Sequence, residues 1–449
     1  MISPTLGAAA AEGWVYLAEG GAHLVLERRD VAGDDPHLAG RVLRLRKTKN
    51  GRNTVDKSPD GSTPEHDAHG DIKNKTERIT DNALWRGHPH FTDQKRTEQE
   101  LDEQDLSWSF VHYIMRPLLG EKFVDAGQYV DVDYEFLNAV ALKVAPERPK
   151  VRVNVSSIDL SATKALLLID AIRVDGNESQ SQSKNFSTFS IELKPKCGFL
   201  LPGDNTDTNI SRFQMHQRLM LANGETHETS QYDPLYLFSG NDAKIKKALA
   251  ALAKFPRNNF RVRRRCETGN STLVFGEGVN ELLEVGSDET GDAHFDTTLV
   301  TLLRVVKQAL KKSDVLSRIL AAQKRDYLGV EKVSAMVQSK QSVHDTLNDP
   351  ALSSILRDFI VSTVAKDCSV LIAARREMGK GEIESKADDG TFSVSFPHTP
   401  DGPEIKYKCR VSVVDVDLKS VKQLAKWLAL DREIREEWGK SLEGGNSVL

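Results

Sequence analysis

Residues 192–196 carry the most informative chemistry of this chain, because an expected strand at residues 189–193 ends in one carboxylate and two ammonium groups. Pro195 fixes its own φ and biases Lys194 toward an extended backbone. Since residues two apart in extended backbone share a face, Glu192, Lys194 and Lys196 are expected to point the same way. Two lysines held beside a carboxylate on a stiff backbone suit a polyanionic ligand. A charged edge strand is an equal alternative from these residues alone.

Residues 19–23 contain Gly20 and Gly21 between two short expected strands. Glycines let backbone amides approach phosphates closely. A Gly-Gly pair is more often a simple hairpin turn, and taken alone these residues favour that interpretation. Arg44, on a following expected strand, adds weight to the phosphate interpretation. A strand cation behind a glycine turn is how protein kinases hold nucleotide phosphates.

Three acids end elements later in the chain. Asp367 lies where an expected helix gives way to a strand, and Asp415 and Asp417 follow another expected strand. In kinases the first such acid faces the substrate hydroxyl and the second holds magnesium over the nucleotide phosphates. Aspartate also caps many elements, so each acid alone favours a structural role. The ordered pair, downstream of a glycine turn and a strand cation, favours phosphoryl transfer.

Further cations lie near the end of the chain and in its middle. Lys419 and Lys422 can share one face close beyond the last acids. Asn258 and Arg261 open a basic run, and arginine offers a bidentate fork for phosphate. We favour a ligand-binding role for Arg261 and a solvated strand face for residues 263–265. A nucleic-acid patch is an alternative for this run.

The composition limits the classes of protein. The chain has 449 residues, 39% hydrophobic and 28% charged, which predicts a globular protein of two or more compact domains. A net charge of −4 speaks against nucleic acid or anionic membranes as partners, so any anion site must be a local basic cluster. Four well-separated cysteines favour a reducing compartment over a disulfide framework or a structural zinc site. We identify no signal peptide and no apolar run that could span a bilayer.

Strands dominate the first part of the chain and helices the second, so we expect an α+β protein with lobes at residues 1–169 and 170–449. A polar segment at about residues 47–98 is expected to be a mobile insertion. Strands are expected at residues 14–17, 22–26, 40–47, 165–170, 189–193, 369–374, 391–396 and 405–414. Helices are expected at residues 101–119, 211–221, 242–253, 297–311, 313–327 (with Ser313 as N-cap), 351–365 and 420–438.

These segments, in this order, resemble the inositol-pentakisphosphate 2-kinases. That family transfers the γ-phosphate of ATP to the axial 2-hydroxyl of inositol 1,3,4,5,6-pentakisphosphate and forms inositol hexakisphosphate (phytate). The most specific match is Glu-Leu-Lys-Pro-Lys-Cys-Gly-Phe at residues 192–199, and the resemblance runs from about Trp14 to Trp438. Other matching stretches are residues 19–22, 42–45, 124–127, 152–154, 211–217, 232–235, 258–261, 365–369 and 415–419.

The resemblance implies a two-lobed, kinase-like fold with a β-rich N-lobe and a larger, helix-rich C-lobe, using ATP and Mg²⁺. Lys194 would bridge the transferred phosphate, and Asp367 would receive the 2-hydroxyl proton and hold Mg²⁺ together with Asp415. The implied nucleotide-side residues are Gly20, Gly21, Ala22, His23, Arg44, Asp170, Glu192 and Asp415. The implied inositol-phosphate residues are Lys49, Arg152, Lys194, Lys196, Asn258, Arg261, Asp367, Lys419 and Lys422.

The chain departs from the family in places. Plant members carry a His/Cys zinc cluster, whereas residues 330–349 lack cysteine, so no zinc is expected and a fungal member fits. Gln214 and Gln423 stand where the family has basic residues, and Lys422 or Lys426 would compensate.

The expected partners are the small-molecule substrates, without nucleic acid or membrane. We expect a monomer inside the cell, in the nucleus or the cytoplasm. The alternative is a scaffold that binds inositol phosphates without catalysis. The joint presence of Lys194, Asp367 and Asp415 argues against it, since a scaffold needs no magnesium acids.

Overall fold

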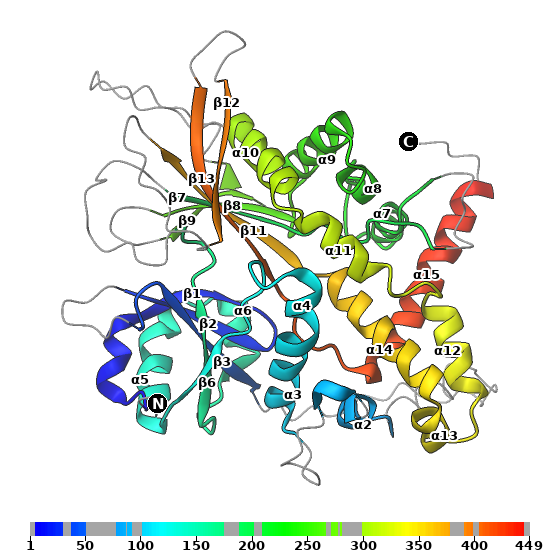
Figure 1. The fold of residues 1–449 in the computed structure, drawn as a ribbon, viewed down its shortest axis with the longest axis horizontal. Helices are drawn as coiled ribbons and strands as arrows, with labels where there is room; N and C mark the ends of the chain where they lie inside the picture. The colour runs from blue at the N-terminus through cyan, green and yellow to red at the C-terminus, as the bar shows by residue number, and fades with distance from the viewer. Residues whose placement is uncertain are drawn as a thin grey trace.

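The computed structural model describes residues 5–29, 37–50, 78–86, 88–91, 101–174, 188–201, 209–265, 271–276, 279–280, 299–377, 390–397 and 404–443 (Figure 1). The described chain is a mixed α/β protein with two antiparallel sheets. In Figure 1 the first sheet lies at the lower left and the second sheet lies above it. The mixed composition of strands and helices agrees with the expected α+β class.

The first sheet is built from the first 170 residues. Its strand order is β1-β2-β3-β6-β4, and β5 pairs with β3. Leu43 and Leu45 are buried while Arg44 between them points to the opposite face, as the period of two in a strand requires. The strands are β1 (Trp14–Glu19), β2 (His23–Arg28), β3 (Arg41–Lys49), β4 (Gln128–Asp131), β5 (Ser156–Ile158) and β6 (Lys164–Ile169).

The second sheet has the order β10-β9-β8-β7-β11-β13-β12. Its strand β7 pairs with β8 and β11, which places Glu192 directly opposite Arg261 on one side and Leu371 on the other. The strands are β7 (Thr188–Leu193), β8 (Phe260–Arg265), β9 (Ser271–Gly276), β10 (Val279–Asn280), β11 (Ser369–Glu377), β12 (Thr391–Pro397) and β13 (Glu404–Val414).

Each sheet has its own core. Helix α5 packs beside β1 in the core of the first sheet, where Trp14 and Phe136 are fully buried. The helices with the second sheet form a larger cluster, in which α14 carries Leu356 and Ile360. The long helices are α3 (Glu103–Phe110), α5 (Tyr134–Val144), α7 (Arg212–Ala222), α9 (Asp242–Lys254), α10 (Leu299–Lys312), α11 (Val315–Gln323), α12 (Val330–Ser339), α14 (Pro350–Ala365) and α15 (Leu424–Glu443). The short ones are η1 (Ala8–Gly13), α2 (Asp81–Arg86), η2 (Pro89–Phe91), α4 (Arg116–Leu119), η4 (Ala145–Glu147), α6 (Lys150–Val153), α8 (Pro234–Leu237), α13 (Val343–Asn348) and η6 (Val421–Gln423).

Residues 101–119, predicted as one helix, form α3, a π-helical turn η3 (Val111–Met115) and α4. Pro117 lacks the N–H group that a regular α-helix would use at this point, and the wider turn accommodates it. The apolar side chains of this segment, including Phe110 and Met115, belong to the core of the second sheet. The division of the chain at residue 169 therefore stays a prediction.

Three expected boundaries are corrected. Ser313 is not the N-cap of α11, because Asp314 takes that place in a left-handed conformation (φ 57°) and the helix ends at Gln323. The segment expected as an insertion begins inside β3, since Lys47 and Lys49 still pair with β5.

Part of the expected insertion is described, as α2 and η2, and Trp85 of α2 packs edge-on against Phe110. The rest of this segment lies outside the described residues, so its expected mobility stays a prediction. Among the helices that are described, none has the length and apolar character needed to cross a membrane.

Candidate active site

A cavity of about 1980 Å³ lies between the two sheets and is lined from both of them. It brings together most of the residues predicted to bind the nucleotide or the acceptor, from distant parts of the sequence. The predicted residues that line it are Gly20, Gly21, Ala22, His23, Arg44, Lys49, Arg152, Asp170, Glu192, Lys194, Asn258, Arg261 and Asp415. Lys196 and Lys419 each form an ion pair with Asp367, and these three residues are not among those that line the cavity. Lys422 is exposed on η6.

The glycine turn, residues 20–22, is a hairpin connection between β1 and β2, as the simpler interpretation predicted. Gly20 donates its N–H to the carbonyl of His23 at 2.9 Å. A Cβ added at Gly20 or Gly21 would meet nothing within 4 Å, so this part of the turn is open. The turn therefore also offers backbone close to the cavity, which is what a phosphate group needs.

A buried ion cluster that the sequence did not suggest supports this turn. The Glu19 carboxylate, with a side chain only 1% exposed, accepts hydrogen bonds from Lys47 Nζ (2.6 Å) and from Arg148 Nη2 (2.9 Å). Lys47 Nζ also donates to the carbonyl of Gly20 at 2.6 Å. Burial alone would raise the pKa of Glu19, but the hydrogen bonds from Arg148 and Lys47 outweigh it and lower that pKa. The turn is thus fixed to β3 and to the segment that leads into α6.

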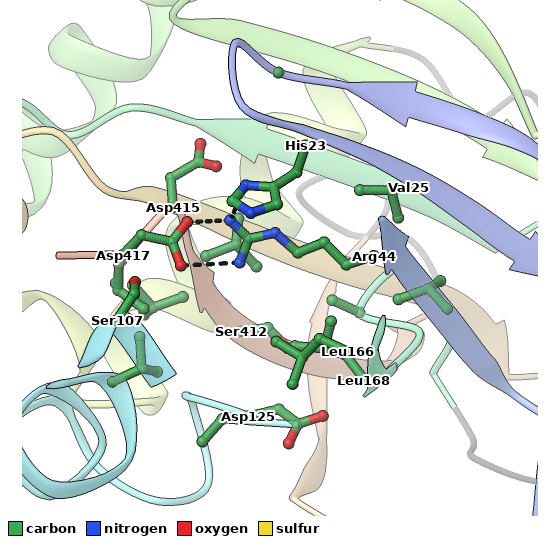
Figure 2. Close-up of a pocket in the computed structure, with 18 of the residues that line it drawn as sticks. His23, Val25, Arg44, Ser107, Asp125, Leu166, Leu168, Ser412, Asp415 and Asp417 are labelled. Atoms are coloured by element: carbon green, nitrogen blue, oxygen red, sulfur yellow. Dashed lines mark hydrogen bonds and ion pairs between the residues drawn. The ribbon is translucent and has the colours of Figure 1, made fainter. Parts of the chain in front are cut away.

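Arg44 lines the cavity and is held by Asp417 and His23 (Figure 2). Its Nη1 donates to Asp417 Oδ1 at 2.9 Å, its Nη2 donates to the other carboxylate oxygen, and Nη2 lies 2.7 Å from His23 Nδ1. Such a bidentate pair fixes the guanidinium plane. Figure 2 shows Val25, Leu166 and Leu168 beside the arginine side chain. These apolar residues line the cavity next to the charges.

The surroundings of His23 make its protonation unfavourable. Burial first, and the neighbouring positive charge of Arg44 second, lower the pKa of His23 from 6.5 to about 4. The imidazole is therefore neutral at physiological pH and can accept a hydrogen bond from Arg44.

The low pKa of His23 predicts a pH-dependent stability. Between pH 6.5 and pH 4 the unfolded chain binds the proton and the folded chain does not, so the free energy of unfolding falls as pH falls, by about 1 kcal/mol per pH unit. We expect His23→Gln to remove this contribution. Urea unfolding of both proteins at several pH values measures it. Parallel stability curves for the two proteins would contradict the assignment.

On the other side of the cavity, carboxylates and ammonium groups alternate. Lys194 Nζ lies 3.5 Å from Asp415 Oδ2, and Lys196 Nζ lies 3.3 Å from Asp367 Oδ1. Lys419 Nζ completes the row at 2.7 Å from Asp367 Oδ2. Partial burial would raise the pKa of Asp367, but Lys419 and Lys196 outweigh it and lower that pKa. Asp367 is thus ionised and half-exposed, beside two cations.

The hydroxyl of Ser369 connects the two acids that flank Lys194. Its Oγ lies 3.1 Å from Glu192 Oε1 and 3.0 Å from Asp415 Oδ2. Asp415 has a left-handed backbone (φ 60°), a conformation that is uncommon outside glycine and that clusters at functional sites. Ser369 was not among the predicted site residues, because its partners Glu192 and Asp415 lie far away along the chain.

The expectation that residues 192–196 form one extended face is wrong at Lys196. Strand β7 ends at Leu193, and Lys196 has φ 59°, which turns the chain out of the strand direction. Glu192 and Lys194 keep the alternation, since the Lys194 N–H still pairs with the carbonyl of Asn259 at 2.9 Å. Pro195 restricts only itself and its predecessor, so nothing in the motif held Lys196 extended.

The remaining predicted residues lie around the cavity. Arg261 Nη1 is 3.9 Å from Glu192 Oε2, in agreement with their paired positions on β8 and β7. Arg152 on α6 and Lys49 at the end of β3 are exposed. Gln423, where a basic residue was expected, also lines the cavity.

Comparison with known proteins shows the family of this chain. The family model described as inositol-pentakisphosphate 2-kinase matches residues 16–433. The chain belongs to that family. An inositol-pentakisphosphate 2-kinase of Arabidopsis thaliana is 31% identical, over 98% of this chain and 96% of its own length. Proteins of the same name from Oryza sativa subsp. japonica (28% identical, 97% of this chain and 95% of the relative) and Cryptococcus neoformans (25% identical, 95% and 93%) match similarly.

The carboxylates of this inositol-pentakisphosphate 2-kinase family member suit the metal that kinases use. Asp367 and Asp415 offer oxygen ligands, which Mg²⁺ prefers, and Mg²⁺ is commonly held by one or two carboxylates plus substrate phosphates. In the part of the chain that the structure describes, no three His, Cys, Asp or Glu residues are grouped to hold a metal ion. A two-carboxylate magnesium site needs no such group.

A second buried ion cluster connects the two sheets of this family member at the back of the cavity. Arg265 of β8 donates to Asp170 Oδ2 at 3.0 Å and also binds the Glu27 carboxylate of β2. Arg173 Nε lies 3.2 Å from Asp170 Oδ2. These four residues are all less than 9% exposed. The expected solvated face at residues 263–265 is therefore wrong for Arg265, and right for Arg264, which is exposed. Asp170, predicted on the adenine side, lines the cavity while its carboxylate serves this cluster.

We expect Arg265→Met to lower the free energy of unfolding by about 3–5 kcal/mol, because it removes one of two cations in the cluster and leaves the buried Glu27 and Asp170 carboxylates with the single charge of Arg173. Arg264→Met, one position away on the exposed face, is the matched control and should change stability by less than about 0.5 kcal/mol. Equilibrium urea unfolding measures both. Equal stabilities of the two variants would show that the cluster does not hold the sheets together.

Proposed function

We propose that this chain is an inositol-pentakisphosphate 2-kinase, which transfers the γ-phosphate of ATP to the 2-hydroxyl of inositol 1,3,4,5,6-pentakisphosphate and yields inositol hexakisphosphate and ADP. Family membership supports the reaction. The observation that carries it is the row Asp415, Lys194, Lys196, Asp367 and Lys419, which adjoins a cavity with a glycine turn on its other side.

We propose a two-lobed, kinase-like arrangement, with residues 1–169 as the N-lobe and residues 170–449 as the C-lobe. The position of the cavity between the two sheets supports it. The apolar side chains of Val25, Leu166 and Leu168 would contact the nucleotide base, since base sites are mostly apolar. The glycine turn and Arg44 would contact the ATP phosphates, and Asp170 and Glu192 would lie on the adenosine side.

The acceptor would bind where cations converge. An inositol pentakisphosphate carries more negative charge than one lysine can balance, so several cations must approach it. The geometry offers them from both sheets and, with Lys419, from the segment between β13 and η6. The proposed acceptor residues are Lys49, Arg152, Lys194, Lys196, Asn258, Arg261, Asp367, Lys419 and Lys422.

The reaction requires positioning and charge neutralisation more than covalent chemistry. Asp367 would accept the proton of the 2-hydroxyl as its oxygen forms a bond to the γ-phosphorus and the bond to the β–γ bridging oxygen breaks. Lys194 would neutralise charge on the phosphoryl group in transfer. Mg²⁺, held by Asp367 and Asp415, would supply further charge neutralisation at the phosphates. Ser369 would orient Asp415 and Glu192 through its hydroxyl.

Incubation of the full chain with Mg²⁺, ATP and inositol 1,3,4,5,6-pentakisphosphate tests the proposal, with ion-exchange chromatography for inositol hexakisphosphate and a coupled assay for ADP. Stoichiometric formation of both products is expected. Binding of the inositol phosphate without turnover, measured by calorimetry, would instead favour a non-catalytic scaffold.

A further inference from the structure

Gln323, the last residue of α11, is completely buried and uses both ends of its side-chain amide. Its Oε1 accepts the N–H of Gly198 at 2.9 Å. Its Nε2 donates to the carbonyl of Lys196 at 2.7 Å and to the carbonyl of Ala365 at 3.1 Å. The opposite amide orientation would place a donor against an N–H and an acceptor against two carbonyls, so only this orientation satisfies the three groups.

These hydrogen bonds join two segments that the proposed reaction needs close together. One segment carries Lys196, and the other, at the end of α14, leads within two residues from Ala365 to Asp367. The side chains of Lys196 and Asp367, one from each segment, form an ion pair at 3.3 Å. Gln323 therefore fixes the backbones from which that pair extends.

The turn at residues 195–198 depends on such support. Lys196 has a left-handed backbone, which is unfavourable for a residue other than glycine and persists only where the surroundings impose it. The hydroxyl of the buried Tyr232 donates to the carbonyl of Pro195 at 2.8 Å, which holds one side of the turn. A Cβ at Gly198 would overlap the Phe238 ring, so the other side is tightly packed. Gln323 binds the carbonyl and the N–H that lie between these two contacts.

The segment that follows α11 makes a further contact with the residues that follow α14. Asp326 is buried, and its Oδ2 accepts a hydrogen bond from Lys366 Nζ at 2.8 Å, directly beside Asp367. The main-chain carbonyl of Gln323 also accepts the Ser362 hydroxyl of α14. The end of α11 is thus bound to the end of α14. The side chain of Gln323 extends from there to the segment that carries Lys196.

We propose that Gln323 is a positioning residue for phosphoryl transfer: its amide holds the Lys196 turn in register with Asp367. This inference rests on the proposed function, since it takes the acceptor-binding role of Lys196 and the proton-accepting role of Asp367 from it. Gln323 acts only through the backbones of these segments. It differs from a purely structural glutamine because its loss should change acceptor binding and turnover more than nucleotide binding.

The experiment uses two substitutions of similar volume in the full chain. Gln323→Met removes all three side-chain hydrogen bonds and fills the same space. Gln323→Glu keeps an acceptor for Gly198 and places a carboxylate against the carbonyls of Lys196 and Ala365. We expect both to lower kcat/KM for inositol pentakisphosphate by about 10- to 100-fold, since small misplacements of this kind cost about that much. The KM for ATP should change less than about twofold, because the glycine turn and Arg44 are untouched.

Two further readouts separate positioning from a general structural role. Ser353→Ala, the matched control, removes a buried hydroxyl of α14 that donates to the main-chain carbonyl of Leu347, away from the Gln323 contacts, and should leave both KM values and kcat unchanged. For Gln323→Glu, lowering the pH protonates the introduced carboxyl and restores one donor. The ratio of variant to wild-type kcat/KM should therefore rise as pH falls. Calorimetric titration with inositol pentakisphosphate in the absence of ATP should show weaker binding by both Gln323 variants.

The outcomes are distinct. Wild-type turnover together with unchanged acceptor KM, kcat and calorimetric affinity in both Gln323 variants overturns the positioning role. Equal losses of kcat/KM for ATP and for the acceptor, or the same losses in Ser353→Ala, also overturn it and assign Gln323 to general stability. A wild-type protein without turnover overturns the proposed function instead, and the calorimetric comparison of the variants still tests whether Gln323 supports the acceptor-binding segment.

Discussion

Asp367→Asn is expected to lower kcat for phosphorylation of inositol pentakisphosphate by about 1,000-fold or more, with a folded protein. The amide has the shape of the carboxylate but cannot accept the 2-hydroxyl proton, a step that contributes typically 10²- to 10⁴-fold. The change also removes the negative charge shared by Lys196 and Lys419 at 3.3 and 2.7 Å. Because the Asp367 side chain is half-exposed, we expect little change in stability.

Steady-state kinetics with both substrates and a thermal unfolding curve measure these effects. Asp358→Asn is the control: this acid lies on α14, pairs with Arg325 at 2.6 Å and stays outside the cavity. It should retain normal kcat. If Asp367→Asn kept more than about a tenth of wild-type kcat, the proton would leave by another route, and the role given to Asp367 would be wrong.

The residues that the sequence identified are those whose chemistry is local. Glu192 and Lys194 stand at the end of one strand, and Asp415 follows another. The position of each could be predicted from its own strand and the residues next to it. The glycine turn could be placed in the same way, because a turn between two strands is a short-range feature. The family resemblance then predicted that these residues act together at one site.

The residues that sequence reasoning missed act through partners far along the chain. Arg265 binds Glu27 across 238 positions, and Ser369 meets Glu192 across 177 positions. Arg264 and Arg265 belong to one basic run, and only the partners of Arg265 in the other sheet show which of the two has a buried role. A signal did exist, since alternate residues of a strand must face opposite sides and one of the two had to point inward.

The end of α11 shows a similar limit. Gln323 is one glutamine in an ordinary helix, and its importance comes from the carbonyls of Lys196 and Ala365 that surround it. Lys196 itself was expected in an extended backbone and is left-handed. Both errors have one cause: a hydrogen-bonding pattern between segments, which no residue spacing encodes, decides the local backbone.

Lys194→Ala is expected to lower kcat by about 100- to 1,000-fold, because it removes the cation that we propose neutralises the phosphoryl group in transfer, where preorganised charge contributes most. Lys194 Nζ lies 3.5 Å from Asp415 Oδ2, in a pair whose carboxylate side chain is 59% exposed. Stability should therefore change little, and the KM for ATP should change much less than kcat.

Lys311→Ala, which breaks an exposed pair with Asp242 at 2.5 Å outside the cavity, is the control and should leave kcat unchanged. Single-turnover measurements at saturating ATP and acceptor separate the chemical step from product release. A normal single-turnover rate in Lys194→Ala would place this lysine outside the reaction, with the alternating charges beside the cavity serving binding alone.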